Sequence, residues 1–176
     1  MTEATPITYR IEAVRAVHNR ATFDCGHPFL NTYLTQFARQ NDQNGVARAY
    51  VAVPAEAGNP VVGYYTLSAG AVAFDNLPPA ICRGLPKYPV PVVRIGELAV
   101  DNALQGQGLG SALLLDALGR IANAAEEVAV WAIVVDPIDQ QASSFYLHHG
   151  FEALPDCETL FLTMKDATTW LSEHEG

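Results

Sequence analysis

The chain has 176 residues, enough for one domain with a sizeable hydrophobic core. Hydrophobic residues make up 49% of the sequence and charged residues 16%, a composition that is typical of a globular protein and excludes a disordered chain. The formal net charge is −9, and because residues 101–176 contain twelve acidic and two basic residues, this half is expected to repel the phosphate backbone of a nucleic acid.

Strands and one helix are predicted in the first hundred residues. Tyr9–Val17 is expected to form the first strand. After Pro28, apolar residues recur at helical spacing, which predicts an amphipathic helix over residues 28–42. The segment from Leu77 to Pro91 contains five prolines and is predicted to be a loop with at most a short helix. Runs rich in Val, Tyr and Ala predict the remaining strands, at 46–53, 61–73 and 92–100.

Helices and strands alternate in the rest of the chain. Apolar residues at helical spacing predict a helix over 109–125, at positions 109, 113, 114, 117, 118 and 121. The apolar run Val128–Val135 predicts a buried strand, and the next helix is expected at 140–149, ending at Gly150. A last strand at 160–164 precedes a short tail helix. With no repeat or linker, residues 1–176 are predicted to form a single α/β (α+β) domain with one main sheet.

The cysteines, histidines and chain start point to no metal, disulfide or membrane site. Cys25, Cys82 and Cys157 are widely spaced and form no CxxC pair, so neither a disulfide framework nor a zinc site is predicted. No apolar run approaches the roughly 18 residues that a membrane span requires. The first residues lack the basic and apolar regions of a secretory signal, so a cytoplasmic protein with no membrane contact is expected.

A glycine-rich turn, Gln105-Gly106-Gln107-Gly108-Leu109-Gly110, lies between a predicted strand and a predicted helix. Glycines at alternate positions let a ligand approach the backbone, and the free N–H groups of a helix start attract anionic oxygens. The turn lacks the Gly-Lys-Ser/Thr sequence of a P-loop, and Ser111 occupies the place of the third glycine of a dinucleotide fingerprint. The turn alone is a weak signal, because tight turns before helices are common.

A second motif, Phe145-Tyr146-Leu147-His148-His149-Gly150-Phe151, follows the next predicted strand and helix start. The pattern Gln-x-x-Gly-x-Gly followed by Phe-Tyr-x-x-x-Gly-Phe resembles the GCN5-related N-acetyltransferase (GNAT) superfamily over roughly residues 7–165. This resemblance implies a central, mixed, mostly antiparallel sheet flanked by helices, with a splayed cleft in mid-sheet for acetyl-CoA. It also implies an acetyl-CoA-dependent enzyme that acetylates an amine.

The resemblance implies where acetyl-CoA binds. The strand before the turn, Leu98, Ala99 and Val100, would bond the pantetheine arm through its backbone. The amides of the turn would hold the pyrophosphate, a role that falls to Gln105, Gly106, Gln107, Gly108, Leu109, Gly110 and Ser111. A backbone N–H near Ala99–Val100 would polarise the thioester carbonyl, as an oxyanion hole does.

Two side chains are candidates for proton transfer. Tyr146 occupies the position where the GNAT family often has a tyrosine that acts as general acid, and a phenol is protonated at neutral pH. The alternative is that Tyr146 is a core aromatic. Glu97, on the strand beside the expected cleft, is the candidate base that deprotonates the amine, through a water. Its alternative is a surface strand residue.

Several segments are similar to one GNAT subgroup, the toxins of bacterial toxin–antitoxin pairs, which acetylate the α-amine of aminoacyl-tRNA. The subgroup implies a ribbon-helix-helix antitoxin as partner and a homodimer. It commonly has arginine before Leu-Ala-Val-Asp, where this chain has Glu97. The similar segments are Phe23–Gly26, Leu30, Tyr33-Leu34, Gly63–Ser68, Leu85–Pro91 and Leu98–Asp101.

Three functions therefore remain open from the sequence. The first is a toxin that acetylates charged tRNA, for which Arg39, Arg48, Arg83, Lys87 and Arg94 are the available basic residues. The second is an enzyme that acetylates a small-molecule or protein amine, with the acidic surface attracting cations. The third is a catalytically silent module that binds CoA or an antitoxin.

Overall fold

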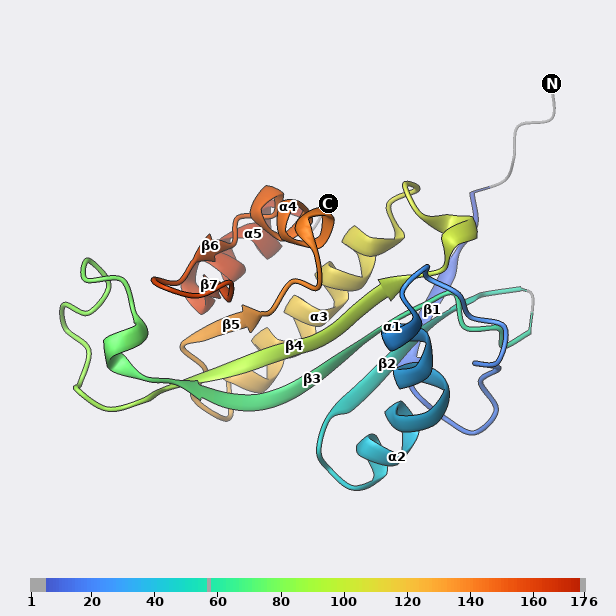
Figure 1. Cartoon of the computed structure of the whole chain (residues 1–176), viewed down its shortest axis with the longest axis horizontal. Helices are drawn as coiled ribbons and strands as arrows, with labels where there is room; N and C mark the ends of the chain where they lie inside the picture. Colours follow the sequence, from blue (N-terminus) through green and yellow to red (C-terminus); the bar gives the residue numbers. More distant parts are fainter. Residues whose placement is uncertain (1–5, 57, 175–176) are drawn as a thin grey trace. The chain divides into compact units, whose positions relative to one another are not determined.

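The computed structural model describes residues 6–56 and 58–174 (Figure 1). Its described strands form one mixed sheet in the order β1-β2-β3-β4-β5-β7-β6, flanked by helices. The pairs β1–β2, β5–β7 and β6–β7 are antiparallel, whereas β4–β5 is parallel. This architecture confirms the predicted mixed, mostly antiparallel sheet. The strands are β1 Tyr9–Ala13, β2 Arg48–Pro54, β3 Gly63–Val72, β4 Val90–Val100, β5 Ala132–Val135, β6 Glu152–Ala153 and β7 Leu160–Thr163.

The residues group into two compact units. Unit 1 contains the chain up to Thr66 and Glu97–Asp116, and unit 2 contains Leu67–Gly96 and the chain from Ala117 onward. The strands β3 and β4 and the helix α3 (Leu109–Ala125) have residues in both units. The single domain expected from the sequence stays a prediction.

The predicted helix at 28–42 forms in unit 1, with a π-helical turn in its middle. It consists of α1 (Pro28–Thr32), a π-helical turn (Tyr33–Phe37) and α2 (Ala38–Gln43). Its core face, Leu30, Leu34 and Ala38, is buried. A π turn shifts carbonyl groups out of the regular helical bonds, and here Arg20 donates to the carbonyl oxygens of Leu34 (3.2 Å) and Thr35 (3.4 Å).

Two predicted strands are shorter than expected. Only Ala132–Val135 of the predicted strand 128–135 is extended, and Val128 is 68% exposed. The N–H of Val128 donates to the carbonyl of Ala124 at 3.0 Å and so extends the end of α3, whereas the N–H of Trp131 already bonds the carbonyl of Pro91 on β4 at 2.8 Å. Similarly, β1 ends at Ala13, and the predicted extension to Val17 is replaced by a turn in which the N–H of His18 bonds the carbonyl of Arg15 at 3.1 Å.

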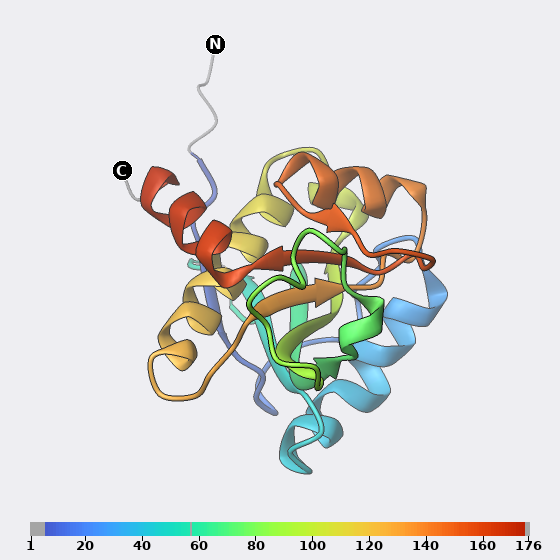
Figure 2. The same ribbon diagram turned by 90° about the vertical axis from the view of Figure 1, so that its left-hand side faces the viewer.

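The other predicted elements of the second half are confirmed. The helix α3 spans Leu109–Ala125, and all six of its predicted core positions are buried. The proline-rich segment is a loop after a 3-10 turn at Phe74–Asn76. In unit 2, α4 (Gln140–His148) and α5 (Met164–His174) both contact β7 (Figure 2). Among the described residues no helix combines the length and apolarity needed to cross a membrane.

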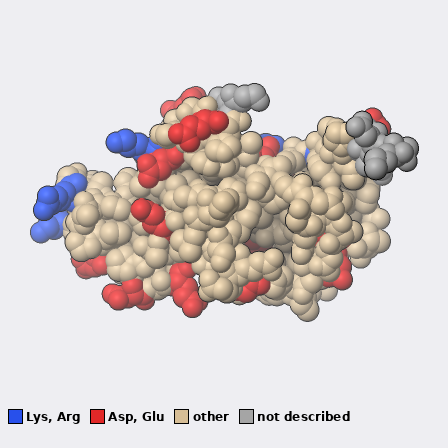
Figure 3. Space-filling model, turned by 90° about the horizontal axis from the view of Figure 1, so that it is seen from above, with Lys and Arg blue, Asp and Glu red and all other residues tan. Residues whose placement is uncertain are grey.

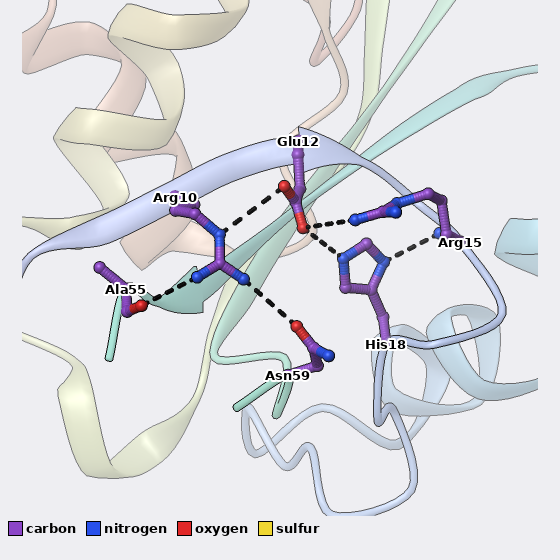
Figure 4. Close-up of polar contacts among 6 residues, drawn as sticks. All are labelled: Arg10, Glu12, Arg15, His18, Ala55 and Asn59. Atoms are coloured by element: carbon purple, nitrogen blue, oxygen red, sulfur yellow. Dashed lines mark hydrogen bonds and ion pairs between the residues drawn. The ribbon is translucent and has the colours of Figure 1, made fainter. Parts of the chain in front are cut away.

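A polar cluster joins β1 to the loop that follows it in unit 1 (Figure 4). The His18 side chain is fully buried, and its Nδ1 accepts the backbone N–H of Arg15 at 2.8 Å. The other ring nitrogen therefore donates to Glu12 Oε1, 2.7 Å away. Arg10 and Arg15 also approach the Glu12 carboxylate, at 3.8 Å and 3.3 Å. The Glu12 carboxylate thus interacts with the buried ring of His18 and with the positive charges of Arg10 and Arg15.

We expect Glu12→Gln to lower stability at neutral pH by about 1 kcal/mol, the scale of a hydrogen bond to a partly exposed charge. The hydrogen bond from His18, followed by the hydrogen bond from Arg15 and the positive charges of Arg10 and Arg15, lowers the pKa of Glu12 below 4.5. A lowered carboxyl pKa stabilises the fold above pH 4.5, and this contribution is lost as the pH falls through the folded-state pKa. Urea unfolding at pH 7 and pH 3 tests this prediction. Glu152→Gln, an exposed glutamate, is the matched control, and an equal effect of both variants at pH 7 contradicts it.

Candidate functional site

The glycine turn of unit 1 presents open backbone at the start of α3. Gly106 and Gly108 have φ values of +76° and +89°, a left-handed conformation that glycine adopts without strain. Among the described residues, apart from each glycine and its two chain neighbours, no atom lies within 4 Å of the place where a Cβ would stand on Gly106 or Gly108. The first helical bond runs from the N–H of Ala112 to the carbonyl of Gly108 at 3.1 Å, so the N–H groups of Leu109 and Gly110 precede it. The turn therefore fits a group with anionic oxygens, such as a pyrophosphate.

Gly108→Leu is expected to weaken CoA binding by about 100-fold or more, because its side chain would occupy the open side of the turn and strain a left-handed backbone. Gly45 supplies a matched control, since it has a φ of +71° and equally open surroundings in the described structure. Gly45→Leu should suffer the same backbone strain and still bind CoA. Titration calorimetry with CoA measures both variants. Equal affinities for the two would remove Gly108 from the binding site.

The end of β4 leads into this turn. The parallel pairing of β4 with β5 runs from Val92–Ala132 to Ile95–Val135, and β4 continues to Val100. Leu98, Ala99 and Val100 thus lie beyond the stretch that pairs with β5. Close packing supports this segment: a Cβ on Gly63 would stand 2.9 Å from Leu113 Cδ1 and 3.2 Å from the carbonyl oxygen of Ala99. The acetyl-CoA cleft itself stays a prediction.

Glu97 is a half-buried carboxyl held by a neighbour on β3. Thr66, only 1% exposed, donates its hydroxyl to Glu97 Oε2 at 2.5 Å and accepts the backbone N–H of Glu97 at 3.1 Å. Burial raises the pKa of Glu97, and the bond from Thr66 opposes that rise. A carboxyl with a raised pKa and a fixed position is suited to accept a proton. The sequence pointed to Glu97 as a candidate base, and nothing in the sequence marked Thr66 as its partner.

Two stacked tyrosines complete the surroundings of Glu97 in unit 1. The rings of Tyr33 and Tyr64 lie 6.3 Å apart and 5° from parallel. Tyr64 donates its hydroxyl to the carbonyl of Leu30 at 2.7 Å, and Asn41 donates to the hydroxyl of Tyr33 at 3.3 Å. Burial raises the pKa of both phenols, and the negative charge of Glu97 raises it further. The raised pKa of both phenols keeps them protonated at neutral pH, so Glu97 is the acidic group of this cluster that can lose its proton first.

Tyr146, the candidate acid, lies on α4 in unit 2 and is 6% exposed. Its ring packs edge-on against Phe145 and Phe151, with ring centres 5.2 Å and 5.3 Å away. Asp139 caps the start of α4 by accepting the N–H of Ala142 at 2.8 Å, and Gly150, with a φ of +92°, follows its end. Both ends of the helix are thus defined, and the contacts with Phe145 and Phe151 hold the buried ring of Tyr146. The remaining predicted site residues, Glu97 to Ser111, belong to unit 1.

The described residues include no group of three or more His, Cys, Asp or Glu side chains that could hold a metal ion. Carboxyl, phenol and backbone groups are the candidates for the chemistry of the site. The Glu97 carboxyl, the Tyr146 phenol and the amides of the glycine turn are the groups of these three kinds that the sequence selected.

The sequence matches the protein family described as Acetyltransferase (GNAT) domain over residues 47–153. A tRNA-acetylating toxin of Mycobacterium tuberculosis is 40% identical over 153 residues, which make up 86% of this chain and 90% of the toxin. Two solved structures are also similar. AtaT complexed with acetyl-methionyl-tRNAfMet has a TM-score of 0.86 and 30% identity, covering 92% of this chain and 98% of AtaT. A tyrosine-to-phenylalanine mutant of AtaT, bound to the C-terminus of the antitoxin AtaR and acetyl-CoA, has a TM-score of 0.78 and 27% identity, covering 92% and 96%.

Proposed function

The chain belongs to the GNAT acetyltransferase family, and we propose that it is a toxin that transfers the acetyl group of acetyl-CoA to the α-amine of an aminoacyl-tRNA. The observation that supports the acceptor is the extensive identity to a tRNA-acetylating toxin across nearly the whole of both chains. A solved relative of similar length holds an acetylated aminoacyl-tRNA, which supports the same acceptor class.

The charge distribution bears on how a tRNA would bind. Asp and Glu side chains are scattered over the face of the molecule drawn in Figure 3, and Lys and Arg gather at few places on it. Because affinity for RNA depends on neutralising phosphates, few basic side chains predict weak tRNA binding with a shallow dependence on salt. We propose that recognition relies on the acceptor end and its aminoacyl group more than on the length of the duplex.

We propose that the glycine turn binds acetyl-CoA, the co-substrate, which supplies an activated acetyl thioester. The amides of Gln105, Gly106, Gln107, Gly108, Leu109, Gly110 and Ser111 bond the pyrophosphate, and the backbone of Leu98, Ala99 and Val100 bonds the pantetheine arm. The open Cβ positions of Gly106 and Gly108 support this placement, since a ligand can reach their backbone. A backbone N–H at Ala99 or Val100 polarises the carbonyl that is attacked.

We propose that two side chains move the protons. The attacking α-amine must be neutral, and the Glu97 carboxylate accepts its proton directly or through one water. The Thr66 hydroxyl keeps one carboxylate oxygen occupied, which leaves the other oxygen for the acceptor. Tyr146 donates a proton to the departing thiolate of CoA. Each of these groups is expected to contribute roughly 10² to 10⁴-fold to the rate.

We also propose an antitoxin as partner and a homodimer as the active form. A structure of AtaT bound to the C-terminus of its antitoxin supports the kind of partner, and a ribbon-helix-helix protein is our specific expectation. Cytoplasmic localisation follows from the proposal, because acetyl-CoA and charged tRNA are cytoplasmic. Light scattering of the purified protein measures its oligomeric state. Expression of the chain alone should arrest growth, and co-expression of a small protein encoded by a neighbouring reading frame should relieve the arrest. This experiment tests the proposed antitoxin.

The decisive experiment offers the purified protein acetyl-CoA together with charged tRNA, uncharged tRNA, polyamines and peptides. Transfer of labelled acetyl groups to charged tRNA alone is the expected result. Transfer to polyamines or peptides, with none to charged tRNA, would replace the acceptor class with a small-molecule or protein amine. If the protein binds acetyl-CoA and transfers acetyl groups to none of these amines, it is a catalytically silent CoA-binding module.

A further inference from the structure

A short segment of unit 1 far from the glycine turn in sequence is anchored in the core beside it. In the segment 23–26, Phe23 and Cys25 are each 4% exposed. The Phe23 ring packs edge-on against Tyr64, with ring centres 5.6 Å apart. Between these two buried side chains, the backbone N–H and carbonyl of Asp24 face the residues that lead into the glycine turn.

Asp24 forms a double bridge to the end of β4. Its backbone N–H donates to Asp101 Oδ2 at 3.1 Å, and its carbonyl accepts the N–H of Asn102 at 2.8 Å. The same Asp101 carboxylate accepts the N–H of Ala103 at 3.0 Å and so starts the 3-10 turn that precedes Gln105. Asp24 and Asp101 together determine where the turn begins.

The Asp24 carboxylate in turn keeps its own segment rigid. It accepts the N–H of Gly26 at 2.9 Å and the side-chain amide of Asn31 at 3.0 Å, and these two bonds lower the pKa of Asp24. The oxygen of the Asn31 amide accepts the N–H of Cys25 at 2.9 Å. Asn31, a side chain of α1, therefore bonds both the Asp24 carboxylate and the backbone of Cys25. We call residues Asp24, Cys25 and Gly26, with the bonds described here, the 24–26 brace.

Gln105, the first residue of the glycine motif, reaches back to this brace. Its side-chain nitrogen donates to the carbonyl of Cys25 at 3.0 Å, to the carbonyl of Val100 at 2.9 Å and to Asn102 Oδ1 at 3.3 Å. Gly26 makes the approach possible, because a Cβ at its φ of +87° would stand 3.1 Å from Asn102 Oδ1. One side chain thus ties β4, the 3-10 turn and the brace together.

We propose that Asp24, Asn31 and Gln105 are positioning residues that hold the glycine turn in its ligand-binding conformation. The backbone amides that face the pyrophosphate have no stiffness of their own, since glycine is free to adopt many conformations. A turn held in advance loses less conformational entropy when the ligand binds, and so binds it more tightly. This inference rests on the proposed function, because it assigns the braced turn to acyl-CoA.

The test compares CoA affinity by calorimetry in four forms of the full chain: wild type, Gln105→Met, Asp24→Ala and the double variant. Methionine keeps the length of glutamine and removes its donors. Each single variant is expected to raise the Kd for CoA about tenfold, the effect of losing one to two net hydrogen bonds. The double variant should raise the Kd for CoA by far less than the product of the two single effects, because each substitution alone already disrupts the same brace.

Two further readouts separate positioning from general destabilisation. Gln105→Met should melt within a few degrees of wild type, and with charged tRNA as acceptor its KM for acetyl-CoA should rise while kcat stays within about twofold. Gln40→Ala, an exposed glutamine on α2, is the matched control and should leave the Kd unchanged. An unchanged Kd in a well-folded Gln105→Met overturns the inference alone. No CoA binding by the wild-type protein overturns the proposed function and the inference with it.

Discussion

Tyr146→Phe should lower turnover about 100-fold or more and leave the affinity for acetyl-CoA unchanged. The substitution removes one hydroxyl and keeps the ring, whose edge-on contacts with Phe145 and Phe151 define its position. General-acid catalysis contributes 10² to 10⁴-fold, so losing the donor should appear in kcat and kcat/KM alike. Single-turnover transfer from labelled acetyl-CoA to charged tRNA measures the chemical step, and calorimetry measures binding.

The chain offers a matched control for this experiment. Tyr88 is 65% exposed in the loop before β4, so Tyr88→Phe removes the same hydroxyl without touching the core. It should leave turnover unchanged. If Tyr146→Phe turns over at the wild-type rate, Tyr146 is a core aromatic residue, and the proton for the leaving group comes from elsewhere, such as a water. A loss of affinity together with rate would indicate instead that the variant disturbs α4.

The parts of the fold that the sequence predicted well are those with local causes. The α3 helix was predicted to the residue because its six apolar positions repeat at 3.6-residue spacing and its start follows the glycine turn. The glycine turn itself was recognisable because positive φ angles at Gly106 and Gly108 leave a signal in the amino-acid type. Both features are encoded within a window of about twenty residues.

The features that the sequence missed depend on contacts between distant residues. Thr66 and Glu97 are 31 residues apart, and only the pairing of their strands brings the hydroxyl to the carboxyl. The 24–26 brace joins residues that are 77 to 80 apart in sequence. Its one local signal is the Asp-x-Gly spacing of Asp24 and Gly26, which is typical of a turn in which the carboxylate accepts the N–H two residues on. Such a pattern predicts a turn and says nothing about the turn's partner.

At Val128–Trp131 the sequence predicted a strand that does not form. Its apolar run predicted a strand because periodicity cannot distinguish a buried strand from the apolar end of a helix. In the structure Val128 bonds back to the end of α3, residues 129–131 belong to neither a helix nor a strand, and β5 consists of the four buried residues Ala132–Val135. The apolar run therefore predicted a strand that was too long, but the strand was predicted at the correct place in the order of elements.

Glu97→Gln should slow acetyl transfer by about 100-fold and at the same time stabilise the fold at neutral pH. Glutamine cannot accept the proton of the amine, so the general-base contribution is lost. It keeps the size of glutamate and an oxygen that can accept the Thr66 hydroxyl. Burial raises the pKa of Glu97 above 4.5, so the folded protein binds a proton more tightly than the unfolded chain. Stability contributed by this group is therefore lost as the pH rises from 4.5 through the folded-state pKa, and the uncharged amide escapes that loss.

The pH profile separates a base from a residue that only packs. In the wild type, kcat/KM should rise with pH through the raised pKa of Glu97, and this limb should vanish in Glu97→Gln. Thr66→Val, of nearly equal shape, removes the bond that lowers this pKa, so the limb should move to higher pH with little loss of the maximal rate. Glu56→Gln, an exposed glutamate of unit 1, is the control and should change neither rate nor unfolding. An acidic limb that stays in place in both Glu97→Gln and Thr66→Val would assign the titrating group to the substrate amine instead.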